Sequence, residues 1–270
     1  MPEERPLILL TGGSGRVGRM LRPLLRQRFD LRVNDIVPVD DMGAGETALT
    51  GDLADPIVAD AAVRGVDGVV HLAGLVAPDV AFADTLAPNY TAVLNLLEAC
   101  RRHDVRRFVF ASSHHILGLL PSSQAYDDHA TIAPDGFYAL SKAFGEAACA
   151  MYAHRYGIAT LVVRIGNADP EIVDGRRERM WTSAVDLARL IGLGLTAEGL
   201  TYEVSYGVST CPDPLFPQTR GPLGYRPVDE ASLHRSADFR ELSSMGTQDG
   251  VGFVGGLFAV TDLPGSKVGA

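Results

Sequence analysis

Three side chains of this sequence could together carry out a proton transfer. Tyr138 and Lys142 are four residues apart in a stretch predicted to be helical, so both project from the same helix face. A nearby ammonium group favours the phenolate form of tyrosine, whose pKa is otherwise about 10. Ser113 ends a predicted strand and could hydrogen-bond to a substrate oxygen. The three would form a proton-transfer set beside a hydride acceptor, although a Tyr-x-x-x-Lys spacing alone also occurs on solvated helix faces.

A glycine-rich segment indicates where a dinucleotide could bind. The spacing Gly12-x-x-Gly15-x-x-Gly18 follows a strand predicted at 7–11 and opens a helix predicted from Arg16 to about Phe29. Glycines allow a tight turn and close approach of the backbone to a pyrophosphate, and the helix N-terminus supplies free N–H groups. The alternative is a strand-to-helix turn that only needs glycine.

The acidic residue that follows the second predicted strand favours NAD over NADP. Asp35 ends a strand predicted at 31–35, about 20 residues after the glycines, where a carboxylate can bind an adenosine ribose and repel a 2′-phosphate. A strand-end turn residue is the alternative. Arg16 argues weakly for NADP, or it neutralises the pyrophosphate. Asp52 could meet the adenine amino group and Leu53 could cover the ring, with an ordinary Asx turn as the alternative.

The elements that must position these residues alternate between strand and helix. Further strands are predicted at 67–74, 107–113 and 158–165, and further helices at 89–103 and 138–156. This alternation implies right-handed crossovers and a parallel sheet with helices on both faces. The expected fold is therefore α/β: a doubly wound parallel sheet of the Rossmann type with a small C-terminal substrate lobe.

The second half of the sequence is less regular. A helix capped by Ser183 is predicted at 183–196 and a strand at 202–208, whereas 167–179 reads as a loop and the Gly-rich tail after Ser236 has no assignment. We expect an NAD-binding core at 1–166 and a small substrate-binding lobe with the tail at 167–270, packed together as effectively one domain.

Composition excludes several classes of protein. The chain has 270 residues, 46% of them hydrophobic, and a formal net charge of −9. The apolar content is too high for disorder, and the negative charge argues against nucleic-acid and anionic-membrane partners. Three scattered cysteines, without Cys-x-x-Cys spacing, fit a reducing compartment. Because the N-terminus also lacks the pattern of a signal peptide, we expect a cytoplasmic protein.

Several motifs resemble those of the extended short-chain dehydrogenase/reductase superfamily, the NAD-dependent epimerase/dehydratase family. They are Thr11–Gly18, His71–Gly74, Ala111–Ser113 and Tyr138–Lys142. Other segments resemble uronate dehydrogenases more closely: Phe110–Gly118, Pro134–Tyr138, Val163–Gly166, Arg176–Ser183 and Leu223–Pro227. The resemblance covers roughly residues 7 to 265.

This resemblance implies oxidation of the anomeric carbon of a cyclic sugar acid by NAD, giving an aldarolactone. Tyr138 would remove the C1 hydroxyl proton and Ser113 would orient that oxygen. Lys142 would hold the nicotinamide ribose and lower the pKa of the tyrosine. Arg176 would bind the substrate carboxylate, a task suited to its bidentate geometry, and His115 would contact the substrate.

The resemblance also implies a cofactor site. Its residues are Gly12, Gly15, Arg16, Val17, Gly18, Asp35, Asp52, Leu53, Leu72, Ala73, Gly74, Asn89, Lys142 and Ile165. Asn89, at the head of its predicted helix, would support Lys142 through a water molecule.

Three positions of the implied substrate site depart from the uronate dehydrogenase pattern. Val76 and Asn167 stand where those enzymes have serine, and His114 stands where they have asparagine. Together with Ser113, His115, Tyr138 and Arg176 they form the predicted substrate site. Valine cannot hydrogen-bond through its side chain, so we expect the chemistry to be retained and the preferred sugar to differ.

Other functions remain open at the level of sequence. One is an epimerase or dehydratase that uses NAD transiently, and another is a non-catalytic NAD-binding protein on the same fold. The short C-terminal half favours a free sugar acid over a nucleotide sugar. A homo-oligomer, a dimer or higher, is expected through the helices at 89–103 and 138–156.

Some residues have simpler explanations than function. His114 and His115 have no Cys, Asp or Glu cluster at metal-ligand spacing, so no metal is expected. His71 lies in a buried strand and reads as a core histidine, and Trp181 reads as a packing residue.

Overall fold

A seven-stranded sheet forms the centre of the computed structural model, which describes residues 5–217 and 223–264. Its order is β3-β2-β1-β4-β5-β6-β8, and all neighbouring strands are parallel. The strands are β1 Leu7–Thr11, β2 Asp30–Asp35, β3 Glu46–Thr50, β4 Gly68–His71, β5 Arg107–Ser113, β6 Ala159–Ile165 and β8 Tyr202–Gly207. The order reverses between β1 and β4, so the predicted doubly wound parallel sheet is confirmed.

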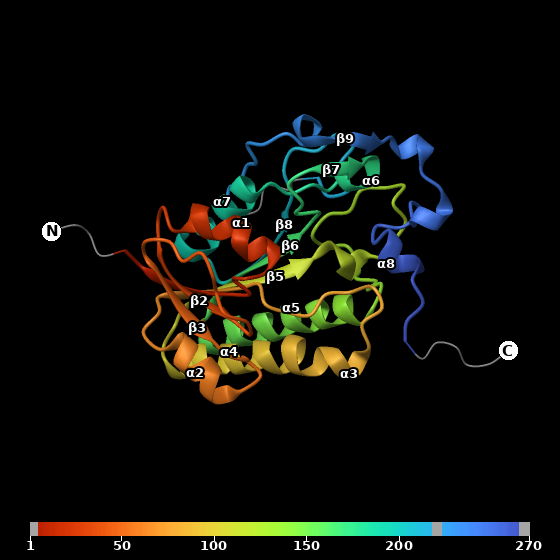
Figure 1. Cartoon of the computed structure of the whole chain (residues 1–270). Coiled ribbons are helices and arrows are strands. Elements are labelled where there is room, and N and C mark those ends of the chain that lie inside the picture. The colour runs from red at the N-terminus through yellow and green to blue at the C-terminus, as the bar shows by residue number, and fades with distance from the viewer. Residues whose placement is uncertain (1–4, 218–222, 265–270) are drawn as a thin grey trace.

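Helices cover both faces of this sheet (Figure 1). On one face lie α1, Arg16–Leu25, and α7, Ala184–Thr196. On the other face lie α2 Pro56–Val63, α3 Phe82–Thr85, α4 Ala92–Arg102 and α5 Phe137–Tyr156. Ser183 caps α7 as predicted, because its hydroxyl accepts a hydrogen bond from the N–H of Asp186 at 2.9 Å.

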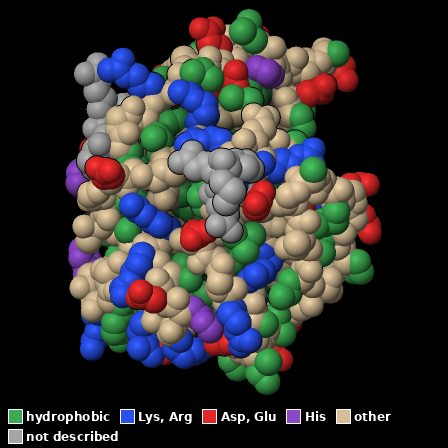
Figure 2. All heavy atoms as spheres, turned by 90° about the vertical axis from the view of Figure 1, so that its left-hand side faces the viewer, with side chains coloured by type: hydrophobic (Ala, Val, Ile, Leu, Met, Phe, Trp, Pro, Cys, Tyr) green, Lys and Arg blue, Asp and Glu red, His purple; other side chains and the backbone are tan. Residues whose placement is uncertain are grey.

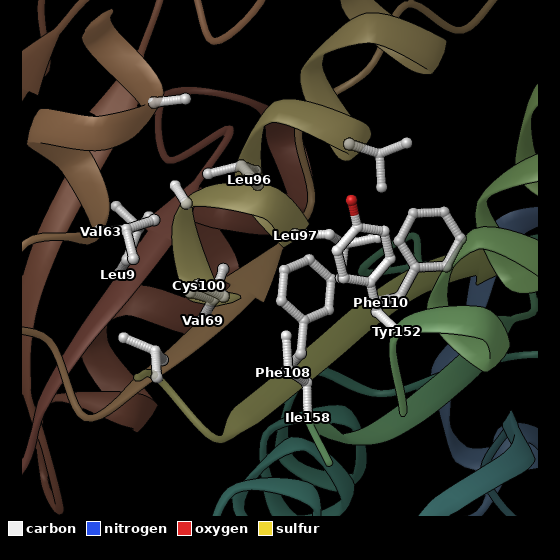
Figure 3. Close-up of a cluster of buried hydrophobic side chains, with 14 of the residues drawn as sticks. Leu9, Val63, Val69, Leu96, Leu97, Cys100, Phe108, Phe110, Tyr152 and Ile158 are labelled. Atoms are coloured by element: carbon white, nitrogen blue, oxygen red, sulfur yellow. The ribbon is translucent and has the colours of Figure 1, made fainter. Parts of the chain in front are cut away.

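Strands β1 and β5 divide their side chains between two hydrophobic cores. Leu9 and Phe108 point into the core beneath α2, α4 and α5 (Figure 3), whereas Ile8, Leu10 and Val109 belong to the core beneath α1 and α7. Successive side chains of a strand point to opposite faces. A strand buried on both faces must therefore be apolar over its central residues, as 7–10 of β1 and 108–111 of β5 are.

The helix predicted at 89–103 begins earlier than expected. Helical structure starts with α3 at Phe82, passes through a π-helical turn at Leu86–Thr91, and continues as α4. The prediction that Asn89 heads its helix is therefore wrong. Pro88 lies inside the turn, where its missing N–H disturbs the regular hydrogen-bond ladder. A proline reads as a helix boundary in the sequence, which explains the error.

The polar stretch 167–179 is not simply a loop, contrary to expectation. It contains the strand β7, Ile172–Asp174, and the single helical turn α6, Gly175–Glu178. Strand β7 pairs in parallel with β9, Arg235–Arg240, in a second, two-stranded sheet. Elements this short depend on pairing with a distant segment, so their own residues carry little signal.

The C-terminal segment follows β9 along one side of the molecule (blue in Figure 1). It contains the short helical turns Leu242–Ser244 and Thr247–Asp249, and then the single helical turn α8, Leu257–Val260. The Pro- and Gly-rich stretch 211–226 lies partly outside the described residues, and so does the end of the tail. The division at residue 166 stays a prediction.

The surface carries both signs of charge. On the face shown in Figure 2, Lys and Arg side chains are interspersed with Asp, Glu and apolar side chains. Within 5–217 and 223–264, no helix has the length and hydrophobicity needed to cross a membrane.

Candidate active site

A pocket of about 370 Å³ opens at the carboxyl ends of β4, β5 and β6. This edge, beside the reversal of strand order, is where ligands bind in doubly wound folds. The pocket brings together many of the predicted site residues: Arg16, Val17, Leu72, Gly74, Val76, Ser113, His114, His115, Tyr138, Lys142, Ile165, Asn167 and Arg176. Sequence positions far apart therefore converge on one cavity.

The three predicted proton-transfer residues meet in this pocket. Ser113 ends β5, and its hydroxyl is hydrogen-bonded to Tyr138. Tyr138 and Lys142 share one face of α5, with the Lys142 ammonium 5.8 Å from the centre of the tyrosine ring. The same ammonium lies 5.1 Å from the ring of Phe110. The arrangement places a hydroxyl, a phenol and an ammonium side by side.

Burial controls the protonation of this trio. It raises the pKa of Tyr138 to about 12, although the hydrogen bond with Ser113 lowers that pKa in part. Burial also lowers the pKa of Lys142 to about 8. The sequence led us to expect a tyrosine pKa lowered by the lysine. In this structure the cost of burying a phenolate dominates, and the nearby Asp135 raises the pKa of Tyr138 further.

Asn89 ties the turn after β4 to helix α5. Its amide group donates to the backbone oxygen of Leu75 at 3.0 Å and to the hydroxyl of Ser141 at 2.8 Å, and its oxygen accepts from the Leu75 N–H at 2.7 Å. One acceptor site of the amide oxygen remains for a water-mediated link to Lys142, which stays a prediction.

The glycine loop is shaped by close packing and leaves a helix end uncapped. Gly12 has a φ of 70°, and a Cβ there would lie 2.8 Å from the backbone nitrogen of Ala73. A Cβ on Gly18 would lie 2.3 Å from the Gly12 oxygen. Gly15 is the N-cap residue that precedes α1, and no side chain caps the free N–H groups there. These groups and the positive end of the helix fit a pyrophosphate.

The residues predicted to meet the adenosine lie away from the pocket. The Asp35 carboxylate, at the end of β2, accepts a hydrogen bond from the Ser14 N–H at 2.9 Å. The Asp52 carboxylate accepts from the Ala54 N–H at 2.9 Å, which is the Asx turn considered as its alternative. Leu53 is only 3% exposed and packs in the core. Arg16 reaches across the pocket mouth and forms an ion pair with Asp169.

The other end of the pocket is built around a buried arginine. Arg176 is 9% exposed, and its guanidinium donates to the backbone oxygen of Val254 at 2.7 Å. Burial lowers its pKa to about 10. The side-chain amide nitrogen of Asn167 is also buried, with no hydrogen-bond partner among the described residues. Both groups are donors suited to an anionic or hydroxylated ligand.

The other two altered positions differ in character. The His114 imidazole is buried and its Nδ1 lies 3.1 Å from the backbone oxygen of Ile165. Burial and the neighbouring charges of His115 and Arg176 keep the pKa of His114 well below its ordinary value, so this ring is neutral. Val76 is 57% exposed and presents an apolar surface to the pocket.

Sequence reasoning missed part of the pocket wall. Gly255, Leu257 and Phe258 line the cavity, and the ring of Phe258 lies 4.1 Å from that of His115, centre to centre. Asp135, whose side chain is fully buried, contacts His115 from the side of α5. The only available signals were the pair Gly255-Gly256 and the Pro134–Tyr138 motif, and neither indicates a distance in space.

The simpler explanations hold for two other residues. His71 is 1% exposed and forms a 2.8 Å hydrogen bond with Thr11, so it is a satisfied core histidine. Trp181 is 2% exposed and donates to the backbone oxygen of Asp169 at 2.7 Å. The described residues contain no group of three or more Cys, His, Asp or Glu that could hold a metal.

Comparison with known proteins agrees with this geometry. The model of the NAD dependent epimerase/dehydratase family matches residues 8–185. The uronate dehydrogenase of Pseudomonas putida is 36% identical, over 94% of this chain and 95% of that protein. Among solved structures, a mutant uronate dehydrogenase from Agrobacterium tumefaciens complexed with NAD has a TM-score of 0.88 at 33% identity, covering 96% of this chain and 98% of that one.

A second solved structure supports the same relationship. A glucuronic acid dehydrogenase from Chromohalobacter salexigens has a TM-score of 0.88 at 31% identity, covering 95% of this chain and 97% of that one. The family match includes the glycine loop, the turn after β4, and the Ser113, Tyr138 and Lys142 trio. By its fold, its pocket and these similarities, the chain belongs to the NAD-dependent epimerase/dehydratase family.

Proposed function

We propose that this protein is an NAD-dependent dehydrogenase that oxidises the anomeric carbon of a free uronic acid, or a close analogue, to a lactone. The observation that carries the proposal is a buried arginine, Arg176, in the pocket that also contains Ser113, Tyr138 and Lys142. A buried charge is costly unless it is paired. No carboxylate among the described residues lies within ion-pair distance of Arg176, so a substrate carboxylate is the fitting partner.

The cofactor side of the site supports NAD. The uncapped end of α1 beyond Gly15 would hold the pyrophosphate, Asp35 the adenosine ribose and Lys142 the nicotinamide ribose. When bound, NAD supplies the hydride acceptor. Asp35 would place a negative charge against a 2′-phosphate, which favours NAD over NADP. The similar uronate dehydrogenase of Agrobacterium tumefaciens has a solved structure in complex with NAD.

The proton-transfer side of the site assigns roles to three residues. Tyr138 accepts the proton of the C1 hydroxyl, and Ser113, hydrogen-bonded to Tyr138, aligns that hydroxyl oxygen. Because burial raises the pKa of Tyr138 to about 12, the tyrosine needs nearby positive charge to act as a base close to neutral pH. Lys142 is the adjacent ammonium that provides it.

Relative to the uronate dehydrogenase pattern, the substrate end of the pocket keeps some contacts and changes others. Arg176 binds the carboxylate with its planar donors. The unpartnered amide nitrogen of Asn167 donates to a further substrate oxygen. Val76 offers no hydrogen bond, so the hydroxyl nearest to it contributes little to binding. The preferred substrate is therefore a sugar acid that does not depend on a polar contact at Val76.

The cysteines and two helix surfaces bear on the compartment and the oligomeric state of the protein. Cys100, Cys149 and Cys211 are free thiols, which supports a reducing cytoplasmic compartment. Leu94 on α4, with Leu140 and Met151 on α5, are exposed apolar side chains that support pairing of two copies through these helices. Light scattering coupled to size exclusion tests the oligomer.

Net reduction of NAD distinguishes the proposed dehydrogenase from an epimerase or dehydratase. With purified protein, NAD and galacturonate or glucuronate, we expect NADH to accumulate well beyond one equivalent per active site, and NMR to show a lactone as the first product. An enzyme that returns its hydride would change the sugar without accumulating NADH. If neither NADH nor a changed sugar is detected with either uronate, the assignment is refuted.

A further inference from the structure

A buried carboxylate behind the pocket contacts one of its histidines. Asp135 stands two residues before α5, and its side chain is fully buried. One carboxylate oxygen lies 2.6 Å from Nδ1 of His115. This distance is that of a strong, charge-assisted hydrogen bond.

Two glycines make room for this carboxylate. A Cβ on Gly118 or on Gly255 would lie 2.0 Å from the same oxygen of Asp135. The two glycines come from distant parts of the chain and are joined by a backbone hydrogen bond of 2.9 Å. Any side chain at either position would displace the aspartate. The backbone is therefore shaped to bring this carboxylate against His115.

Ring contacts fix the orientation of the His115 imidazole, in addition to its hydrogen bond with Asp135. Its ring lies between those of His114 and Phe258, each 4.1 Å away between ring centres, and edge-on to Tyr138 at 6.0 Å. The backbone N–H of His115 also donates to the Ser113 hydroxyl at 3.2 Å. With Nδ1 held by Asp135, the remaining ring nitrogen, Nε2, has no protein partner among the described residues.

The carboxylate determines which ring nitrogen carries the proton. Burial raises the pKa of Asp135 to about 7. Above that pH the carboxylate is ionised and only accepts hydrogen bonds, so Nδ1 of a neutral imidazole must be the donor. Nε2 then carries a lone pair and can only accept. Burial and the nearby Arg176 guanidinium keep His115 neutral by lowering its pKa to about 3.

We propose that Asp135 is a positioning residue that holds His115 as the Nδ1–H tautomer, so that Nε2 accepts a hydrogen bond from a substrate hydroxyl. The inference rests on the proposed function only for the identity of that hydroxyl. It makes His115 selective: a sugar hydroxyl at this place is bound, and a deoxy or carbonyl group there leaves Nε2 without a donor. Asp135 itself does not touch the substrate.

The tautomer can be measured without turnover. In ¹⁵N-histidine-labelled protein at pH 8.5, long-range ¹H–¹⁵N correlation spectra distinguish protonated from unprotonated ring nitrogens. The chain has seven histidines, and the His115→Gln variant identifies the signals of His115. We expect protonated Nδ1 and unprotonated Nε2 in the unchanged protein. A dominant Nε2–H tautomer, or two protonated nitrogens, would overturn the proposal.

Two variants of Asp135 test whether this residue determines the tautomer of His115. In Asp135→Asn the amide can donate as well as accept, and in Asp135→Ala no partner remains, so both should increase the Nε2–H population. The matched control is Asp127→Asn, an exposed aspartate in the preceding loop, which should leave the spectrum unchanged. The same tautomer in all four proteins would contradict the role of Asp135, even if one variant folds poorly.

Kinetics then separates positioning from mere folding. If uronates are substrates, Asp135→Asn should raise KM about tenfold with a smaller change in kcat, and the loss should disappear for the analogue lacking the recognised hydroxyl. Equal losses for both substrates would reject selectivity through His115. If the unchanged protein oxidises no uronate, the proposed function fails while the NMR result still decides the tautomer.

Discussion

The two sides of the pocket are built from the sequence in different ways. The cofactor side consists of turns that directly follow β1, β2 and β4, and each turn carries its own motif. The substrate side draws on the ends of β5 and β6, on α6, and on Gly255–Phe258 near the C-terminus. Under the proposed assignment, local motifs specify the cofactor, whereas the sugar would be bound by segments that only the fold brings together. Substrate preference can change on one side while the chemistry persists on the other.

The largest expected effect concerns the residue shared by both sides. Replacing Tyr138 by Phe removes the proton acceptor, so kcat should fall about 10²- to 10⁴-fold. NAD binding, measured by fluorescence titration, should remain nearly unchanged because the phenol contributes to the proton transfer. The control is Tyr156→Phe at the other end of α5. Retained turnover in Tyr138→Phe would remove the assigned base.

The buried Asp135 on the substrate side should carry a cost in stability that grows as pH rises. Burial raises the pKa of Asp135 from 3.8 to about 7, against the lowering influence of the Arg176 charge. Between these pH values Asp135 binds more protons in the folded state than in the unfolded state, so the contribution of Asp135 to stability falls as pH rises from about 4 to about 7. At 1.36 kcal/mol per unit the loss is at most about 4 kcal/mol.

Denaturation of the Asp135→Asn variant isolates this cost. The free energy of unfolding of the unchanged protein should decrease relative to the variant as pH rises from 4 to 8, whatever constant offset the substitution adds. Asp127→Asn, with its exposed side chain, should show no such trend. Parallel pH profiles for the protein and Asp135→Asn would contradict the burial of an ionisable carboxylate at this position.

The next effect tests the substrate side alone. Arg176→Gln removes charge-assisted hydrogen bonds worth about 1.5–3 kcal/mol, which corresponds to a 10- to 100-fold loss of kcat/KM for uronates. The kcat/KM for a neutral aldose such as galactose should not fall, and KM for NAD should stay the same. The exposed Arg64→Gln is the control. An equal loss for uronate and aldose would show that Arg176 only maintains the fold.

The smallest effect tests the cofactor side alone. Asp35→Asn weakens about one hydrogen bond to the adenosine ribose, worth about 1–1.5 kcal/mol, so KM for NAD should rise about tenfold. Removal of the negative charge should also improve NADP relative to NAD. KM for the uronate should not change. A changed sugar KM with an unchanged NAD KM would reverse the assignment of the two sides.

The sequence predicted the sheet and the residues at its strand ends better than the segments that tertiary packing brings to the pocket, for physical reasons. Strands β1 and β5 are buried on both faces, so their apolar runs are distinct, and Tyr138 and Lys142 share a helix face by spacing alone. The π-helical turn around Asn89 was not predicted, because Pro88 indicates a helix boundary in the sequence. Phe258 reaches the pocket, and Asp135 reaches His115 behind it, through tertiary packing, which local periodicity does not encode.

Comparing galacturonate with galactose tests the central claim most directly, because the two sugars differ only in whether C6 is a carboxylate. With saturating NAD, we predict net NADH formation and a kcat/KM for galacturonate at least about tenfold higher, as expected for a carboxylate held by charge-assisted hydrogen bonds. Equal values for the two sugars, or no NADH from any uronate, would contradict a site built around Arg176.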